Sequence, residues 1–194
     1  MNAPQPRDTA ELPSHYQKHL TVNLKTNRKI TIFIQGTFLG VVLIAVVVAL
    51  LSELPLPGWS PWITVPVTLL ACVLYMAAHE ATHGVTLRLL TGTKPHYAVR
   101  FPFLTTSSPL FLTRRSTIIT ALAPCIIWGA VLVGALFVVP DELRLMSYIL
   151  LTLNFAGSAG DYVEAVLAFR QPKRALLQDE GDRFHGFNPR KLNT

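Results

Sequence analysis

Charged residues are scarce in this sequence, and their scarcity limits the kind of protein that it can encode. Asp, Glu, Lys and Arg make up 14% of the 194 residues, and apolar residues make up 51%. Soluble globular proteins have roughly 25% charged residues. The net charge of +6 would suit nucleic acid, but the basic residues lie between long apolar runs, which favours anionic lipid headgroups. We therefore expect a lipid bilayer, and no nucleic acid, as the partner.

Cysteines and processing signals are also few. The two cysteines, Cys72 and Cys125, both lie in apolar segments and provide no disulfide framework. The first 29 residues are polar and include three prolines, so they lack the apolar core of a cleavable signal peptide. We therefore expect the first apolar run to remain in the membrane.

Four apolar runs stand out, and each is long enough to cross a bilayer, which takes roughly 20 helical residues. The first and third runs have almost no polar face, which argues against buried helices of a soluble protein. The sequence therefore predicts an all-α membrane protein with one domain of four transmembrane helices at 30–169. The predicted spans are about 30–51, 62–90, 116–139 and 143–169.

The basic residues are distributed unevenly between these runs. All but one of the 17 lysines and arginines lie before the first run, between His83 and the third run, or in the tail. These three regions are on one side of the four predicted spans. Because cytoplasmic loops carry an excess of Lys and Arg, we expect a multi-pass protein of the cell membrane with both termini in the cytoplasm. The N-terminal segment would be 1–29 and the basic tail 170–194.

The segment 91–115, between the second and third runs, is too polar for lipid and contains three prolines. Residues 96–101 alternate in polarity as a strand does. We expect a cytosol-side loop that can contain a short β-hairpin. His96 is a candidate for substrate contact, although an interfacial polar position explains it better.

The strongest motif, His79-Glu80-Ala81-Thr82-His83, lies inside the second run. Residues four apart share a helix face, so the imidazoles of His79 and His83 can bind one metal ion. Glu80 then reaches the water that the ion activates and acts as general base. Such polar residues are costly in a membrane span unless they are functional. The motif therefore predicts a catalytic zinc site, with a metal-free polar cluster as the weaker interpretation.

A third ligand is expected from the fourth run, since catalytic zinc usually has three protein ligands. Asp161 is the favoured candidate, and Glu164, one turn later, is the alternative. His79 and Asp161 would lie at about 25 and 27 Å from the outer ends of their spans at helical rise. The predicted metal ligands are therefore His79, His83 and Asp161.

Asn154 lies seven residues before Asp161 and would share its helix face. We consider two roles for it: a catalytic hydrogen bond to the oxyanion or the scissile backbone, or an interhelical hydrogen bond. The predicted catalytic residues are Glu80 and Asn154. The remaining polar candidates are expected at solvated ends of the chain: His15, His19, His185 and the motif at 179–182.

The order of these motifs resembles the bacterial "putative zincin peptidase" family of unknown function. The resemblance lies in the His-Glu-x-x-His span, the polar loop, Ala121-Leu122-Ala123-Pro124 and Asn-x-x-Gly-Ser-x-Gly-Asp at 154–161, and covers about Tyr75 to Phe169. The chain is more distantly similar to the site-2 protease group of intramembrane zinc proteases. That resemblance implies an aspartate ligand preceded by an asparagine, as Asp161 and Asn154 are here. The chain departs from the site-2 pattern because no proline follows Asn154 and Tyr162 replaces a glycine.

These features predict an intramembrane zinc metallopeptidase that cleaves a membrane protein or peptide in or near the bilayer. The alternative is a zinc-binding membrane scaffold or regulator without proteolytic activity, in which Glu80 would be dispensable. A small transporter is less favoured, since the four runs show no inverted repeat. The pattern favours no particular natural substrate, pathway or oligomeric state.

Overall fold

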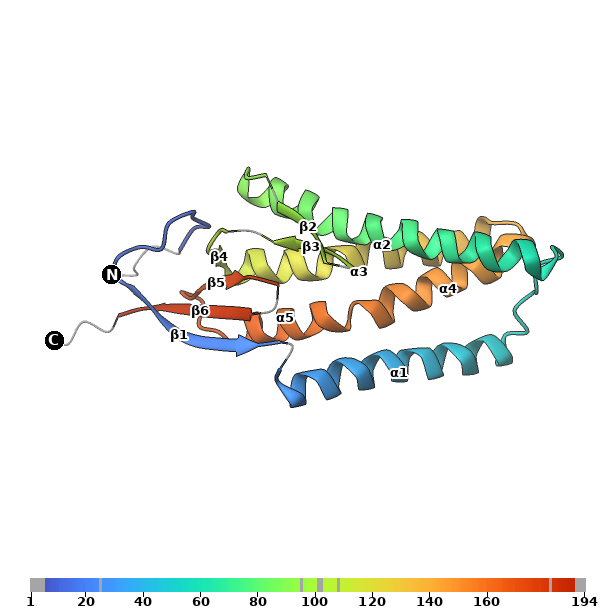
Figure 1. Cartoon of the computed structure of the whole chain (residues 1–194), viewed down its shortest axis with the longest axis horizontal. Coiled ribbons are helices and arrows are strands. Elements are labelled where there is room, and N and C mark those ends of the chain that lie inside the picture. Colours follow the sequence, from blue (N-terminus) through green and yellow to red (C-terminus); the bar gives the residue numbers. More distant parts are fainter. Residues whose placement is uncertain are drawn as a thin grey trace.

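The computed structural model describes residues 6–24, 26–94, 96–100, 103–107, 109–181 and 183–190. Its helices lie roughly side by side, and a small sheet sits at the end that carries both termini (Figure 1). The helices are α1 (Arg28–Leu51), α2 (Pro61–Thr91), α3 (Arg114–Val138), α4 (Asp141–Gly157) and α5 (Ala159–Phe169). The strands are β1 (Tyr16–Asn23), β2 (His96–Arg100), β3 (Phe103–Ser107), β4 (Leu112–Thr113), β5 (Leu176–Asp179) and β6 (Arg183–Pro189).

The first three helices are long and apolar enough to cross a membrane. The mean hydropathy of their most apolar stretches is 2.6 in α1, 1.8 in α2 and 2.3 in α3. No residue of α1 is buried, although most of its side chains are apolar. Each helix begins and ends within two residues of the span predicted for it. Three long apolar helices are therefore confirmed at the predicted places.

The fourth predicted helix is present but interrupted. It forms α4, of 17 residues, and α5, of 11 residues, which follow one another along the same line (Figure 1). The interruption falls at Ser158, in the stretch Gly157-Ser158-Ala159-Gly160. Glycine and serine are weak helix formers in a helix interior, which explains why the helix restarts there. Asp161 consequently lies in the first turn of α5.

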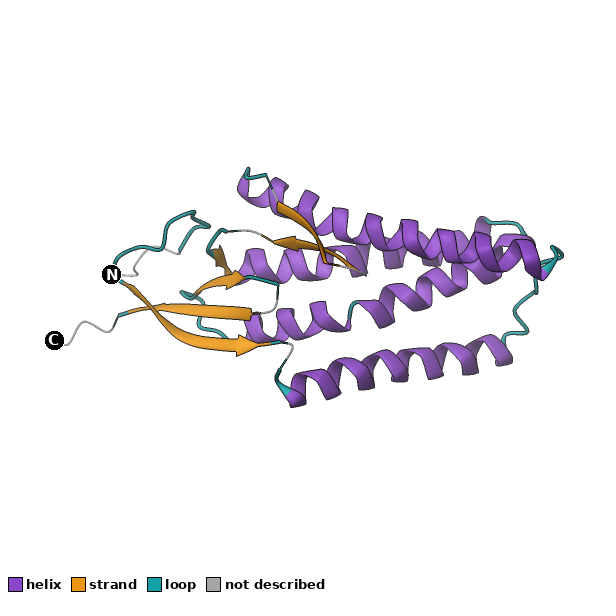
Figure 2. Ribbon diagram, in the orientation of Figure 1, coloured by secondary structure: helices purple, strands orange, loops and turns teal. Residues whose placement is uncertain are grey.

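The prediction of an all-α fold is wrong at the termini. Together with β4, which comes directly before α3, they build a four-stranded antiparallel sheet in the order β1-β6-β5-β4 (Figure 2). Phe184, which has no exposed surface, packs with Ala168 of α5, Ala175 and Leu177 beneath this sheet. These strands were missed because β1 and β6 are more than 150 residues apart in sequence. Their pairing depends on the helices bringing both termini to one end.

One histidine of the tail differs from its prediction. His185, predicted at the surface, is 4% exposed, because β6 lies inside the sheet between β1 and β5. Its Nδ1 lies 3.0 Å from Thr21 Oγ1 and its Nε2 lies 3.3 Å from Glu180 Oε2. Gly181, with a φ of 86°, allows the left-handed turn between β5 and β6. His15 and His19 are exposed as predicted.

The segment between α2 and α3 contains the hairpin that was considered for it. Strands β2 and β3 are antiparallel, with His96 opposite Ser107 and Arg100 opposite Phe103. Strand β3 packs along α2, the helix that carries the His-Glu-x-x-His motif. The side chain of His96 and the prolines Pro95 and Pro102 lie outside the described residues, so the role considered for His96 stays a prediction.

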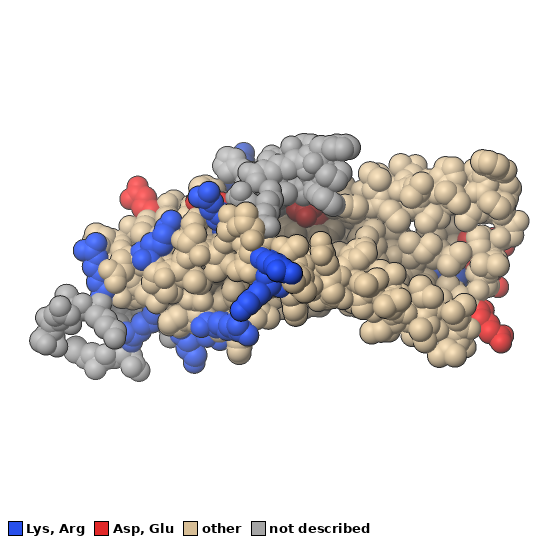
Figure 3. Space-filling model, turned by 60° about the horizontal axis from the view of Figure 1, so that its bottom comes forward, with Lys and Arg blue, Asp and Glu red and all other residues tan. Residues whose placement is uncertain are grey.

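Charge is separated along the molecule. Lys and Arg side chains gather over the end with the sheet, and a long uncharged surface extends from it (Figure 3). The sheet lies at this end of the helices because β1 comes shortly before the start of α1 and β5 comes shortly after the end of α5. The metal-ligand candidates lie on α2 and α5, between the basic end and the far end.

Candidate metal centre

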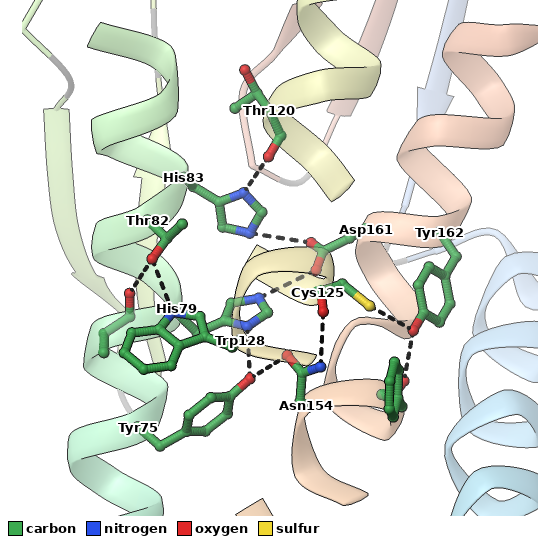
Figure 4. Close-up of polar contacts among 12 residues, drawn as sticks. Tyr75, His79, Thr82, His83, Thr120, Cys125, Trp128, Asn154, Asp161 and Tyr162 are labelled. Carbon is green, nitrogen blue, oxygen red and sulfur yellow. Dashed lines mark hydrogen bonds and ion pairs between the residues drawn. The ribbon is translucent and has the colours of Figure 1, made fainter. Parts of the chain in front are cut away.

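The three predicted metal ligands meet at one point between α2 and α5. One nitrogen of His79, one of His83 and a carboxylate oxygen of Asp161 all lie within 4.8 Å of one another. His79 Nε2 is 3.3 Å from Asp161 Oδ2, and His83 Nε2 is 3.4 Å from Asp161 Oδ1. The side chains of both histidines are 12% exposed and that of Asp161 is 19% exposed. The cluster is thus largely buried, and the three side chains point toward one another (Figure 4).

Local structure explains how the ligands meet. His79 and His83 are one turn apart on α2, and their ring centroids are 5.1 Å apart, so both rings face the same way. Trp128 of α3 donates its indole N–H to Thr82 Oγ1 at 3.0 Å, which ties the middle of the motif to a neighbouring helix. Asp161 comes from the first turn of α5, directly after the interruption.

The ring of His83 is held in a defined orientation by α3. Its Nδ1 lies 2.8 Å from the backbone carbonyl oxygen of Thr120. A carbonyl only accepts hydrogen bonds, so Nδ1 carries the proton and donates it. In the neutral ring Nε2 then has a free lone pair, and this is the nitrogen that faces Asp161. Such a partner on the second ring nitrogen is usual for a histidine that binds a metal.

The donor set fits zinc. Zinc is commonly bound by nitrogen and oxygen ligands at about 2.0–2.1 Å. His79 Nε2 lies 3.3 Å from one Asp161 oxygen and His83 Nε2 lies 3.4 Å from the other, so the carboxylate faces both rings. Two histidines and a carboxylate also leave a fourth position open, as catalytic zinc sites do. Zinc would therefore be held by His79, His83 and Asp161.

A cavity of about 410 Å³ reaches this cluster, and Glu80 contributes to its wall together with Tyr75, His79 and Asp161. The rest of the wall is apolar and comes from α1, α2, α4 and α5, with Ile34, Phe38, Val73, Met76, Ala77, Leu153, Ala156, Gly157 and Ala159. Glu80 thus faces the space next to the metal ligands without being one of the three. This is where a general base acting on a water beside the ion has to be.

The structure separates the two candidates from the fourth run. Among the described residues, the group that could hold a metal includes Asp161 and not Glu164. Asn154 has no exposed surface; its amide nitrogen donates to the carbonyl of Cys125 at 3.0 Å, and its Oδ1 accepts from the Tyr75 hydroxyl at 2.7 Å. Asn154 therefore makes the interhelical hydrogen bonds considered for it. A catalytic contact of its amide stays a prediction.

Two residues of the site were missed from the sequence. Tyr75 lies 3.1 Å from His79 Nδ1 through its hydroxyl, and a signal existed, because it precedes His79 by one helical turn. Thr120 acts through its backbone carbonyl, which every residue has. No side-chain pattern could have identified it.

Comparison with known proteins agrees with this geometry. A family model described as "Putative zincin peptidase" matches residues 72–176, slightly more than half of the chain. The matched region contains the three candidate metal ligands, Glu80, and the segment between them. No curated protein and no solved structure matches the chain. The chain belongs to the putative zincin peptidase family, and zinc is the ion that this family implies for the site of His79, His83 and Asp161.

Proposed function

We propose that the protein is an intramembrane zinc metallopeptidase, which hydrolyses peptide bonds in or near the lipid bilayer. One observation carries the proposal: ligand atoms of His79, His83 and Asp161 lie within 4.8 Å of one another, and Glu80 lines the adjoining cavity. The family match supports a metallopeptidase. The membrane location and the roles of individual residues are our proposal.

The exposed apolar surface supports a membrane location. Leu50 is 75% exposed, Trp62 89% and Val138 82%, and such side chains cover α1, α2 and much of α3. Exposed apolar area on this scale is rare in soluble monomers. In the proposed arrangement α1, α2, α3 and the α4–α5 pair cross the bilayer. The sheet and both termini face the cytoplasm, where basic residues are enriched.

The chemistry follows from the placement of Glu80. When bound, zinc supplies Lewis acidity towards the scissile carbonyl and towards the attacking water. Glu80 takes the proton of that water as it attacks, then transfers the proton to the leaving amine. His79, His83 and Asp161 hold the ion, and the negative charge of Asp161 offsets part of its positive charge. The low polarity of the surroundings strengthens these interactions.

The substrate in this proposal is an apolar segment of a membrane protein or peptide. The cavity of about 410 Å³ is within the range of ligand-binding pockets, roughly 300–1,000 Å³, and most of its wall is apolar. A helical segment conceals its scissile bond and must unwind before cleavage. The neighbouring hairpin of β2 and β3 offers strand edges that can hold such an unwound segment as an added strand.

Replacing Glu80 by Gln tests the function. Membrane proteomes of cells that carry the wild-type protein or Glu80→Gln are compared. Full-length precursors are expected to accumulate with Glu80→Gln, and their shortened products with the wild type. Zinc content of the two purified proteins is the control and should be equal, because Glu80 is not among the three ligands.

A different result would favour the scaffold or regulator. If Glu80→Gln restores the phenotype of a deletion strain as well as the wild type does, and no precursor accumulates, the protein does not act as a peptidase. A loss of zinc from Glu80→Gln would instead mean that the variant alters the metal site, and the test would then use cleavage of an identified precursor at saturating zinc.

A further inference from the structure

A chain of hydrogen bonds runs from His79 into the buried space between three helices. His79 Nδ1 lies 3.1 Å from the Tyr75 hydroxyl, which lies 2.7 Å from Asn154 Oδ1. The amide nitrogen of Asn154 in turn lies 3.0 Å from the carbonyl oxygen of Cys125 on α3. The four groups connect α2, α4 and α3 in one continuous line (Figure 4). None of the three groups beyond His79 is a metal ligand.

The direction of each hydrogen bond in this chain can be deduced from its last member. The Cys125 carbonyl only accepts, so the amide nitrogen of Asn154 must face it and Oδ1 must face Tyr75. Oδ1 also only accepts, so Tyr75 donates its single hydroxyl proton to Asn154. The hydroxyl oxygen of Tyr75 is then left as an acceptor. His79 Nδ1 must therefore carry the proton in that contact.

This tautomer is the one that metal binding needs. With the proton on Nδ1, the neutral ring presents the lone pair of Nε2 towards Asp161. The opposite tautomer would place a proton on Nε2, where it would be attracted to the Asp161 carboxylate and would block the ligand atom. The distance from Nε2 to Asp161 Oδ2 is 3.3 Å, longer than the 2.7–2.9 Å or so of an N–H donor on a carboxylate. This spacing agrees with a proton on Nδ1.

The two histidines differ in what holds them. His83 depends on the backbone carbonyl of Thr120, which every substitution at that position retains. His79 depends on the side chains of Tyr75, 7% exposed, and Asn154, fully buried. We propose that Tyr75 and Asn154 are positioning residues, which hold His79 as the Nδ1–H tautomer and so prepare its Nε2 for the metal. The inference rests on the metal centre of the proposed function.

Gly129 of α3 provides the room that this arrangement requires. A Cβ atom at position 129 would lie 3.2 Å from Asn154 Nδ2 and 3.3 Å from Phe155 Cζ. Both distances are tighter than ordinary van der Waals contact, so Asn154 would have to move by a few tenths of an ångström. Gly134, five residues later in the same helix, has no atom within 4 Å of such a Cβ. Gly129→Ala therefore displaces Asn154, and Gly134→Ala is its matched control.

The first experiment measures zinc affinity of the purified full-length protein by competition with a chromophoric chelator. Tyr75→Phe removes only the hydroxyl, and its expected effect is a loss of roughly 10- to 100-fold in affinity, as for other partners of metal-bound histidines. Tyr148→Phe is the control: the Tyr148 hydroxyl donates to the Ala45 carbonyl at 2.6 Å, between α4 and α1. Its affinity should equal that of the wild type.

The second experiment reads the tautomer directly, from ¹⁵N spectra of labelled histidines in the metal-free protein. In the wild type His79 should show a protonated Nδ1 and a bare Nε2. In Tyr75→Phe a protonated Nε2 should become populated, while the signals of His83 stay unchanged. A merely structural role of Tyr75 would lower the melting temperature without this change. Gly129→Ala should weaken zinc binding relative to Gly134→Ala. If Tyr75→Phe does not fold, Gly129→Ala replaces it in both experiments.

The outcomes distinguish failure of the inference from failure of the proposed function. Unchanged affinity and tautomer in Tyr75→Phe, or in Gly129→Ala if that variant is used, overturn the positioning role and leave the peptidase standing. Cleavage that survives Glu80→Gln overturns the peptidase and leaves the positioning role intact. Failure of the wild-type protein to bind zinc or cobalt overturns both.

Discussion

Replacing Asp161 by Asn removes the negative charge of the carboxylate that faces both His79 and His83. The carboxylate lies 3.3 and 3.4 Å from the two histidine nitrogens, and an amide of nearly the same shape would occupy its place. Structural zinc sites with four ligands bind with about 10–16 kcal/mol, roughly 3 kcal/mol for each ligand. Loss of one ligand therefore corresponds to a loss of about a hundredfold in zinc affinity, since 1.4 kcal/mol is about tenfold.

The assay for Asp161→Asn is chelator competition, followed by metal analysis of the purified protein after dialysis. Asp141→Asn is the matched control, because Asp141 is 65% exposed and pairs with Arg144 at the start of α4. It should retain wild-type affinity. Wild-type affinity in Asp161→Asn would refute the assignment of the third ligand. A loss in Glu164→Gln alone would then identify the ligand that the sequence left as the alternative.

Two further predictions concern stability. Removing zinc with a chelator should lower the melting temperature, and adding zinc back should restore it. The reason is that a ligand at a thousand times its Kd stabilises the folded state by about 4 kcal/mol. If the melting temperature of the wild type or of Glu80→Gln does not change when zinc is removed, the metal centre is contradicted. Gly186→Ala should destabilise the sheet by roughly 1–3 kcal/mol, because its Cβ would lie 2.9 Å from His19 Cε1 and 3.2 Å from Leu20 Cβ. Thermal unfolding compares it with Gly40→Ala, where nothing lies within 4 Å, and equal stability of the two would refute this packing.

Much of the helical part of the fold could be predicted, because its signals are local. Apolar runs of spanning length predicted α1, α2 and α3, and the spacing of His79 and His83 placed both rings on one face of α2. The interruption at Ser158 was not predicted, although Gly157 and Gly160 flank it. Glycine is tolerated in many helices of membrane proteins, so composition alone did not distinguish a break from a close helix contact.

The sequence by itself determined the chemistry: which residues could bind a metal, which carboxylate could serve as base, and which segments prefer lipid. These properties belong to residue types and to spacings within one helix, so they do not depend on distant parts of the chain. The tertiary structure alone decided three other features: that Asp161 and not Glu164 lies beside the two histidines, that β1 pairs with β6, and that the ring of His83 faces the Thr120 carbonyl. Each depends on the relative placement of segments far apart in sequence, where the rotation of a helix about its axis or a shift of one register step changes which atoms meet.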